Sequence, residues 1–118
     1  MSPDTPPPFD VVEITTDGAC GRVRSEWARC ACAGHFPGDP LLPGSALLAV
    51  MVDVAARLMG TVDLPPARVR RCTFRRTVRP NEEIIVRGHT VGTGRAMVAV
   101  EASGRRVAEA AVEFGHVR

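Results

Sequence analysis

The sequence predicts an α+β domain in which an antiparallel sheet wraps around one apolar helix. The stretch Ser45–Met59 has a helical pattern with only Asp53 and Arg57 charged, so we expect it to be buried on most sides. Stretches typical of strands follow it, separated by turn residues, at about Arg68–Val78, Glu83–Gly92, Arg95–Ala102 and Arg105–Phe114. A chain of 118 residues fits a single domain, and no internal repeat is visible.

Turn signals define the elements that precede the helix. Residues 1–7 are expected to form a disordered leader, and residues 8–118 the single domain. A first strand is expected at about Phe9–Thr15, before a turn at Asp17-Gly18. The alternation in Ala19–Trp27 predicts a second strand, with Cys30–Ala33 leading into the next loop. Gly60 is expected to end the helix.

Composition and charge exclude several classes of protein. All 15 basic residues are arginine, and the net charge of +2 is too small to indicate nucleic-acid binding. The N-terminus has no apolar signal segment, and no stretch supplies about 18 uninterrupted apolar residues, so we expect a cytoplasmic protein without a membrane span. Cys30, Cys32 and His35 match no common zinc spacing, and we expect neither a metal nor another cofactor.

Residues 34–44, Gly-His-Phe-Pro-Gly-Asp-Pro-Leu-Leu-Pro-Gly, are the most informative segment of the chain. Its prolines fix φ and extend the residues before them, which stiffens the loop that carries His35. Gly44 allows the backbone to come close to a ligand where the helix begins. The segment therefore predicts an imidazole beside the free N–H groups of a helix N-terminus, which suits proton removal next to a carbonyl. A rigid turn with a surface histidine is the alternative.

The pattern His-Phe-Pro-Gly-x-Pro-x-x-Pro-Gly before an apolar helix resembles the 3-hydroxyacyl-[acyl carrier protein] dehydratases of fatty-acid synthesis, which have the hot-dog fold. Pro8-Phe9, Val69–Pro80 and Arg106–Phe114 are similar to three of the family's strand segments, so the resemblance covers about residues 8–114. It implies dehydration of 3-hydroxyacyl-carrier-protein thioesters to 2-enoyl thioesters by a dimer. Small residues at Cys30–Ala33, where the family often has bulky aromatics, suggest a remodelled acyl tunnel that suits a polyene or aryl-capped chain rather than an ordinary saturated one. The expected pathway is a polyketide or specialised fatty-acid pathway.

The resemblance also implies roles for the residues around the loop. Dehydration needs a base for the C2 proton, an acid for the departing hydroxyl group and a donor to the enolate oxygen. His35 is expected to be the base, because imidazole ordinarily titrates near neutral pH. The N–H of Gly44, with Ser45, is expected to hold the thioester carbonyl, and Ser45 is also expected to cap the helix. Phe36 is expected beside the substrate, where it packs the loop.

The acid is where this sequence departs from the family. The family's helix carboxylate stands fourteen residues after the histidine, and Ala49 occupies that position here. The only helix carboxylate is Asp53, one turn later, which serves either as the acid or as the i,i+4 ion-pair partner of Arg57. The chain is therefore either a self-sufficient enzyme or a catalytically reduced subunit that binds carrier protein or lends His35 to a Glu-bearing partner. A hot-dog thioesterase is a further alternative.

Arginines are concentrated between residues 68 and 79. The run is either a solvated strand face or a docking surface for an acidic partner. The resemblance implies that this partner is an acyl carrier protein, with Arg70, Arg71, Arg75 and Arg76 as the docking residues. A nucleic-acid partner is not expected, because Phe74 is the only aromatic residue within the run.

Overall fold

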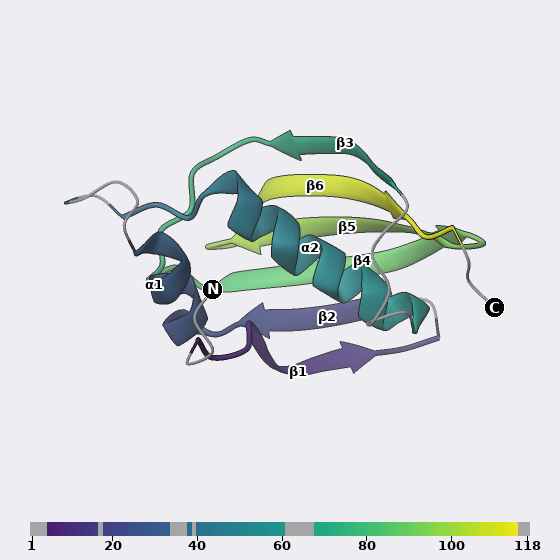
Figure 1. The fold of residues 1–118 in the computed structure, drawn as a ribbon, viewed down its shortest axis with the longest axis horizontal. Coiled ribbons are helices and arrows are strands. Elements are labelled where there is room, and N and C mark those ends of the chain that lie inside the picture. Colours follow the sequence, from purple (N-terminus) through teal and green to yellow (C-terminus); the bar gives the residue numbers. More distant parts are fainter. Residues whose placement is uncertain (1–4, 17, 34–37, 39, 61–67, 116–118) are drawn as a thin grey trace.

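The computed structural model describes residues 5–16, 18–33, 38, 40–60 and 68–115. The described elements, in chain order, are β1 (Phe9–Ile14), β2 (Gly18–Val23), α1 (Ser25–Cys32), α2 (Gly44–Met59), β3 (Arg68–Phe74), β4 (Ile84–Gly92), β5 (Arg95–Ala102) and β6 (Arg105–Glu113). The strands form one antiparallel sheet in the order β1-β2-β4-β5-β6-β3, so β1 and β3 are its edges (Figure 1). No helix in these ranges is long and apolar enough to cross a membrane.

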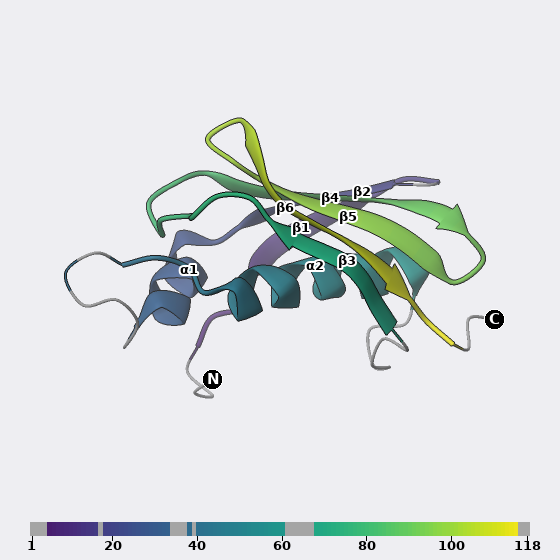
Figure 2. The same cartoon turned by 90° about the horizontal axis from the view of Figure 1, so that it is seen from above.

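Helix α2 lies diagonally across one face of the sheet, whereas no described helix covers the opposite face (Figures 1 and 2). Because side chains alternate along a strand, every second residue of the central strands points toward the helix. The apolar core contains, from the helix, Leu47, Val50, Met51 and Val54, and from the sheet, Val86, Val98, Val100, Ala110 and Val112. This arrangement confirms the predicted α+β architecture of a sheet around one helix.

The two ends of α2 differ in how well the sequence predicted them. Gly60 adopts a left-handed conformation with φ 71° and its N–H donates to the carbonyl of Arg57 at 3.2 Å, so it ends the helix as predicted. At the start, Pro43 is the N-cap residue and no side chain caps the helix. The expectation that Ser45 caps the helix is wrong, because the extended Pro43 already ends the loop and places Ser45 inside the first turn.

The outer face of α2 is less buried than the sequence suggested. Ser45 and Ala49 are exposed, and Leu48, Val52 and Asp53 are half-buried. The expectation of a helix buried on most sides is therefore wrong for this face. The physical reason is that the sheet of a single chain covers only one side of the helix.

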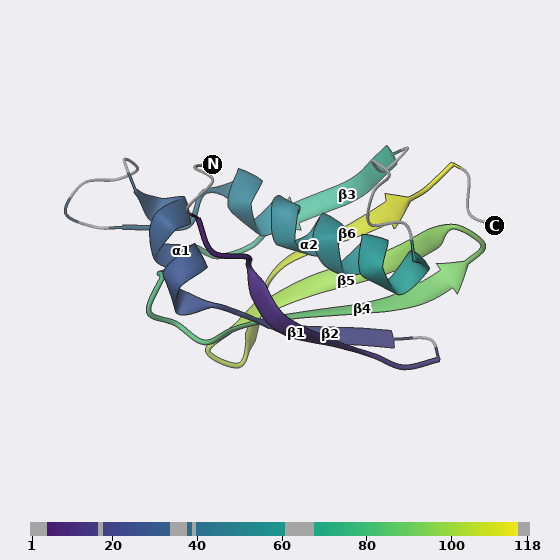
Figure 3. The same cartoon turned by 60° about the horizontal axis from the view of Figure 1, so that its bottom comes forward.

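The segment after β2 is the largest error in the predicted secondary structure. The expected strand Ala19–Trp27 ends at Val23, and Ser25–Cys32 forms helix α1, which includes the residues expected to begin a loop. Trp27, Ala28 and Cys32 are buried at 4%, 1% and 5% exposure, a spacing that matches one helix face. Figure 3 shows α1 beside the start of α2, so the helix covers the end of the core where the candidate site lies.

Candidate active site

The start of α2 is held in place by the connection between β3 and β4. The N–H of Leu42 donates to the carbonyl of Val78 at 2.8 Å, and both side chains are buried, at 6% and 0% exposure. This contact places the end of the proline-rich loop against a segment 36 positions later in the sequence. The predicted base His35 and the predicted substrate contact Phe36 lie outside the described residues.

Two backbone amides at the start of α2 are available to a ligand. The carbonyl of Pro43 accepts the N–H groups of Ala46 at 3.0 Å and Leu47 at 3.3 Å. The N–H groups of Gly44 and Ser45 have no acceptor in the described part of the chain, and the first turn carries no acidic residue. Since the first N–H groups of a helix carry its positive dipole end, this turn is suited to bind a negatively charged oxygen.

Phe74 is a residue of the site that the sequence did not identify. A methyl group placed on Gly44 would lie 3.4 Å from the Phe74 ring, so the ring packs beside the first turn of α2. Phe74 is 47% exposed, which is high for an aromatic residue, and it lies at the end of β3 opposite Ala108. The pairing of β3 with β6 sets this position, and no local sequence signal reveals it.

Asp53 forms the ion pair that was one of its two predicted roles. Its Oδ1 accepts a hydrogen bond from Nε of Arg57 at 2.6 Å, with side-chain exposures of 24% for Asp53 and 38% for Arg57. The carboxylate therefore has a partner on its own helix. Ala49 lies one turn earlier on the exposed outer face of the helix. The acid role of Asp53 stays a prediction.

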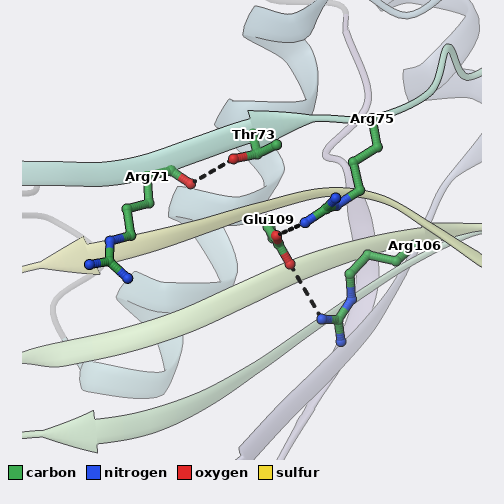
Figure 4. A network of polar contacts seen from close by, with 5 residues as sticks. All are labelled: Arg71, Thr73, Arg75, Arg106 and Glu109. Carbon is green, nitrogen blue, oxygen red and sulfur yellow. Dashed lines mark hydrogen bonds and ion pairs between the residues drawn. The ribbon is translucent and has the colours of Figure 1, made fainter.

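The predicted docking arginines divide into two groups. Arg70 pairs with Glu113 at 3.6 Å, and Arg75 pairs with Glu109, whereas Arg71 and Arg76 have no ion-pair partner in the described ranges. Arg71 lies at an irregularity of β3 with φ 52°, and its carbonyl accepts the hydroxyl group of Thr73 at 3.3 Å (Figure 4).

Glu109 on β6 has two arginine partners. Arg75 donates a hydrogen bond to one carboxylate oxygen, and Nη1 of Arg106 donates to the other at 3.3 Å (Figure 4). The hydrogen bond from Arg75, ahead of the charge of Arg106, lowers the pKa of Glu109 below its ordinary value. Glu109 therefore neutralises part of the arginine run that the sequence shows.

The small residues at positions 30–33 lie at the end of α1 rather than in a loop. Cys30 is exposed and Cys32 is buried, and burial raises the pKa of the Cys32 thiol. Neither cysteine is paired in a disulfide. The hypothesis of a remodelled acyl tunnel stays a prediction, because the adjoining loop residues 34–37 lie outside the described ranges.

Comparisons with known proteins identify the family of the chain. The family model ApeI-like, described as ApeI dehydratase, matches residues 14–109. A 3-hydroxyacyl-[acyl-carrier-protein] dehydratase FabZ from Latilactobacillus sakei is 32% identical over 80 residues, covering 58% of this chain and 57% of the relative. The protein of the same name from Thermus thermophilus is 32% identical over 92 residues, covering 69% of this chain and 65% of the relative. The chain thus spans less than two thirds of the length of these relatives.

Solved structures support the fold. The dehydratase heterocomplex ApeI:P from Xenorhabdus doucetiae superposes with a TM-score of 0.70 at 15% identity, covering 84% of this chain and 88% of that one. At this identity the likeness concerns the fold alone. Together with the central helix and the six-stranded order described above, it confirms the predicted hot-dog fold.

Proposed function

The chain belongs to the family of ApeI-like dehydratases, and from this membership we propose that it converts 3-hydroxyacyl thioesters carried on acyl carrier protein into 2-enoyl thioesters. The observation that carries the proposal is the start of α2, where the amides of Gly44 and Ser45 have no acceptor in the described part of the chain. They follow directly after the His-Phe-Pro-Gly loop. The proposed pathway is a polyketide or specialised fatty-acid pathway.

The proposed reaction is an elimination of water. The imidazole of His35 removes a proton from C2, and negative charge develops on the thioester oxygen. The N–H groups of Gly44 and Ser45 donate to this oxygen at the positive end of α2, which lowers the energy of the enolate. The C2=C3 double bond then forms as the C3–O bond breaks, and a proton from the acid joins the departing hydroxyl group to give water.

His35→Ala tests the proposal directly. We expect the loss of the base to lower kcat/KM by about 10²-fold or more, with the melting temperature unchanged, because a loop imidazole contributes little packing. The measurement is the rate at which 3-hydroxyacyl-carrier protein loses one water, followed by mass spectrometry. His89→Ala is the matched control, since His89 is exposed on β4. Full activity of the His35→Ala variant, alone or in any complex, would contradict the assignment of the base.

For the acid, we propose Asp53, which is the one carboxylate of α2. Its partner Arg57 holds the carboxylate at 2.6 Å, so Asp53 must exchange this contact for the hydroxyl group of the substrate when it acts. The side chain is 24% exposed, which leaves it accessible from the outer face of the helix.

A second candidate function is supported by the outer face of α2. Ala49 stands where the family has its carboxylate, and Leu48 and Val52 leave apolar surface half-exposed beside it. A related hot-dog subunit that packs against this face would cover the apolar surface and supply a Glu opposite His35. The chain would then be the reduced half of a heterodimer. This hypothesis predicts that the purified chain is nearly inactive alone and regains activity on mixing with a Glu-bearing homologue.

As the partner of the arginine run we propose an acyl carrier protein. Arg71 carries the clearest unneutralised charge, whereas Arg70 and Arg75 are paired with glutamates of β6. We expect Arg71→Glu to weaken carrier-protein binding, more so at low ionic strength, and to leave turnover of a small thioester unchanged. Arg95→Glu is the control, because Arg95 is an exposed arginine at the start of β5, a strand that β6 separates from β3. Equal effects of both variants would contradict the docking site.

A further inference from the structure

A cavity of about 460 Å³ lies between the connection from β3 to β4 and the turn from β5 to β6. Arg76 and Thr77 line it on one side, and Ser103 and Arg105 on the other. The proposed function requires a substrate whose acyl group is attached as a thioester to a phosphopantetheine arm. Resting on that function, we propose that this cavity binds the phosphate group of the arm.

The charges around the cavity carry this proposal. Arg75 and Arg76 are neighbours in sequence, as are Arg105 and Arg106. One member of each pair, Arg75 and Arg106, binds Glu109, as Figure 4 shows. The other members, Arg76 and Arg105, line the cavity and have no ion-pair partner within the described residues. Thus one pair of guanidinium groups is neutralised by the protein, while the second pair is left for an anion from outside.

The one acid at the cavity does not neutralise these two arginines. Glu82 also lines the cavity, but it forms no ion pair with either arginine. With two guanidinium groups and one carboxylate, the lining has a net positive charge. An anion that enters it exchanges water for charge-assisted hydrogen bonds.

The chemistry of the lining favours a phosphate over a single carboxylate. A phosphate group presents several acceptor oxygens, and each guanidinium group can donate two parallel hydrogen bonds to it. The hydroxyl groups of Thr77 and Ser103 add donors at the same cavity. Ala102 and Val107, both 2% exposed, supply the apolar part of the lining.

Backbone contacts fix both walls of the cavity. The N–H groups of Arg75 and Arg76 donate to the carbonyl of Val107, at 2.7 Å and 3.4 Å, which ties the first wall to β6. In the second wall, Ser103 has φ 52°, and its N–H donates to the carbonyl of Glu83 at 3.1 Å. Both walls therefore hold their positions before a ligand arrives, which reduces the ordering cost of binding.

The cavity lies at the end of the sheet where α2 begins. Phe74 packs on Gly44, and Arg76 follows it by two residues along the same connection. Figure 2 shows the β5–β6 turn curving away from the side on which α2 lies. A phosphate held there is separated from the first turn of α2, which is what the substrate requires, since the pantetheine chain separates its phosphate from its thioester.

Titration of the purified protein with 4′-phosphopantetheine and with pantetheine tests the cavity without any turnover. We expect the phosphorylated ligand to bind at least about tenfold more tightly, and the double variant Arg76→Ala/Arg105→Ala to remove this difference. Arg95→Ala, which removes an exposed arginine at the opposite end of the sheet, should preserve it. Equal binding of both ligands by the wild-type protein, or equal losses in both variants, would overturn the proposal.

Kinetics with three substrates distinguishes the phosphate from other anions. The 3-hydroxyacyl group is presented on N-acetylcysteamine, on 4′-phosphopantetheine and on carrier protein. We expect the double variant to raise KM about tenfold for the last two and to leave the first unchanged. A loss confined to carrier protein would overturn the proposal in favour of a carboxylate site, and a loss on all three would indicate a structural role. If the wild-type protein dehydrates none of them, the proposed function fails, and the titration still decides what the cavity binds.

Discussion

Asp53→Asn separates the two roles that this aspartate can have. The amide keeps the shape of the side chain and can still accept a hydrogen bond from Arg57, but it cannot deliver a proton. If Asp53 is the acid, the variant loses catalysis. If Asp53 only pairs with Arg57, the variant loses a small amount of stability and nothing else.

The exposure of the Asp53–Arg57 ion pair determines how much stability its removal costs. The pair is an i,i+4 contact on a helix, with side chains exposed by 24% and 38%, so solvent screens much of its charge interaction. Such pairs contribute about 0.3–0.5 kcal/mol, and we expect the melting temperature to fall by only about 1–3 °C. Removal of a general acid, by contrast, costs about 10²–10⁴-fold in rate. The two effects differ so much that a single variant distinguishes them.

The assay compares Asp53→Asn with Arg57→Gln, both as purified protein. Each variant removes the charge pair, but only Asp53→Asn removes the carboxyl group. We expect similar melting temperatures for the two variants and a loss of kcat/KM only in Asp53→Asn. Wild-type activity in Asp53→Asn would refute the assignment of Asp53 as the acid.

Ala49→Glu gives the complementary result. It restores the family's carboxylate on the exposed outer face of α2, about 6 Å along the helix axis from Asp53. In a self-sufficient enzyme this change should do little or lower the activity, because the site is already arranged around Asp53. In the reduced half of a heterodimer it should create activity in the isolated chain. The same two substitutions therefore have opposite outcomes under the two hypotheses.

Three further predictions concern stability. Gly60→Ala should lower the unfolding free energy by about 1 kcal/mol, because φ 71° disfavours alanine although nothing lies within 4 Å; an unchanged urea midpoint would contradict this. Met51→Ala should cost about 2–5 kcal/mol, since the side chain is fully buried, and a smaller loss would show that the core collapses around the cavity. The hydrogen bond from Arg75 lowers the pKa of Glu109 in the folded protein, so the pair adds to stability above the ordinary glutamate range and this stability is lost as the pH falls through the pKa of the folded state. Glu109→Gln should therefore flatten the acid side of the curve of unfolding free energy against pH. An unaltered curve would refute the role of the pair.

Most of the fold could be predicted from the local pattern of apolar and polar residues. The strands from β4 to β6 were predicted within one residue at each end, because their alternation reflects a sheet with one face on the core. The error at Ser25–Cys32 has a physical reason: the segment has only 8 residues, so its helical spacing extends over about two turns and is too short to outweigh the alternation that precedes it. Its helical form depends on packing of Trp27 and Cys32 against the core, which a sequence window does not contain.

The candidate site was predictable where its residues are adjacent in sequence. The proline-rich loop and the start of α2 follow one another, so the resemblance identified them together. The arginine run was harder, because the glutamates that neutralise it, Glu109 and Glu113, come from β6. Only the register of β3 on β6 shows which arginines remain available, and a register is set by long-range pairing rather than by local composition.

The connection between β3 and β4 explains why the two proposed binding elements belong to one site. Phe74 packs on the first turn of α2, Arg76 lines the cavity, and the carbonyl of Val78 receives the N–H of Leu42. Since Val78 and Leu42 are both buried, water does not compete for their hydrogen bond, and the connection and the start of α2 are held in one fixed arrangement. A ligand bound at Arg76 is therefore positioned relative to the amides of α2 by the fold itself. This coupling lets a single short segment position both the arm of the substrate and the turn proposed to stabilise its enolate.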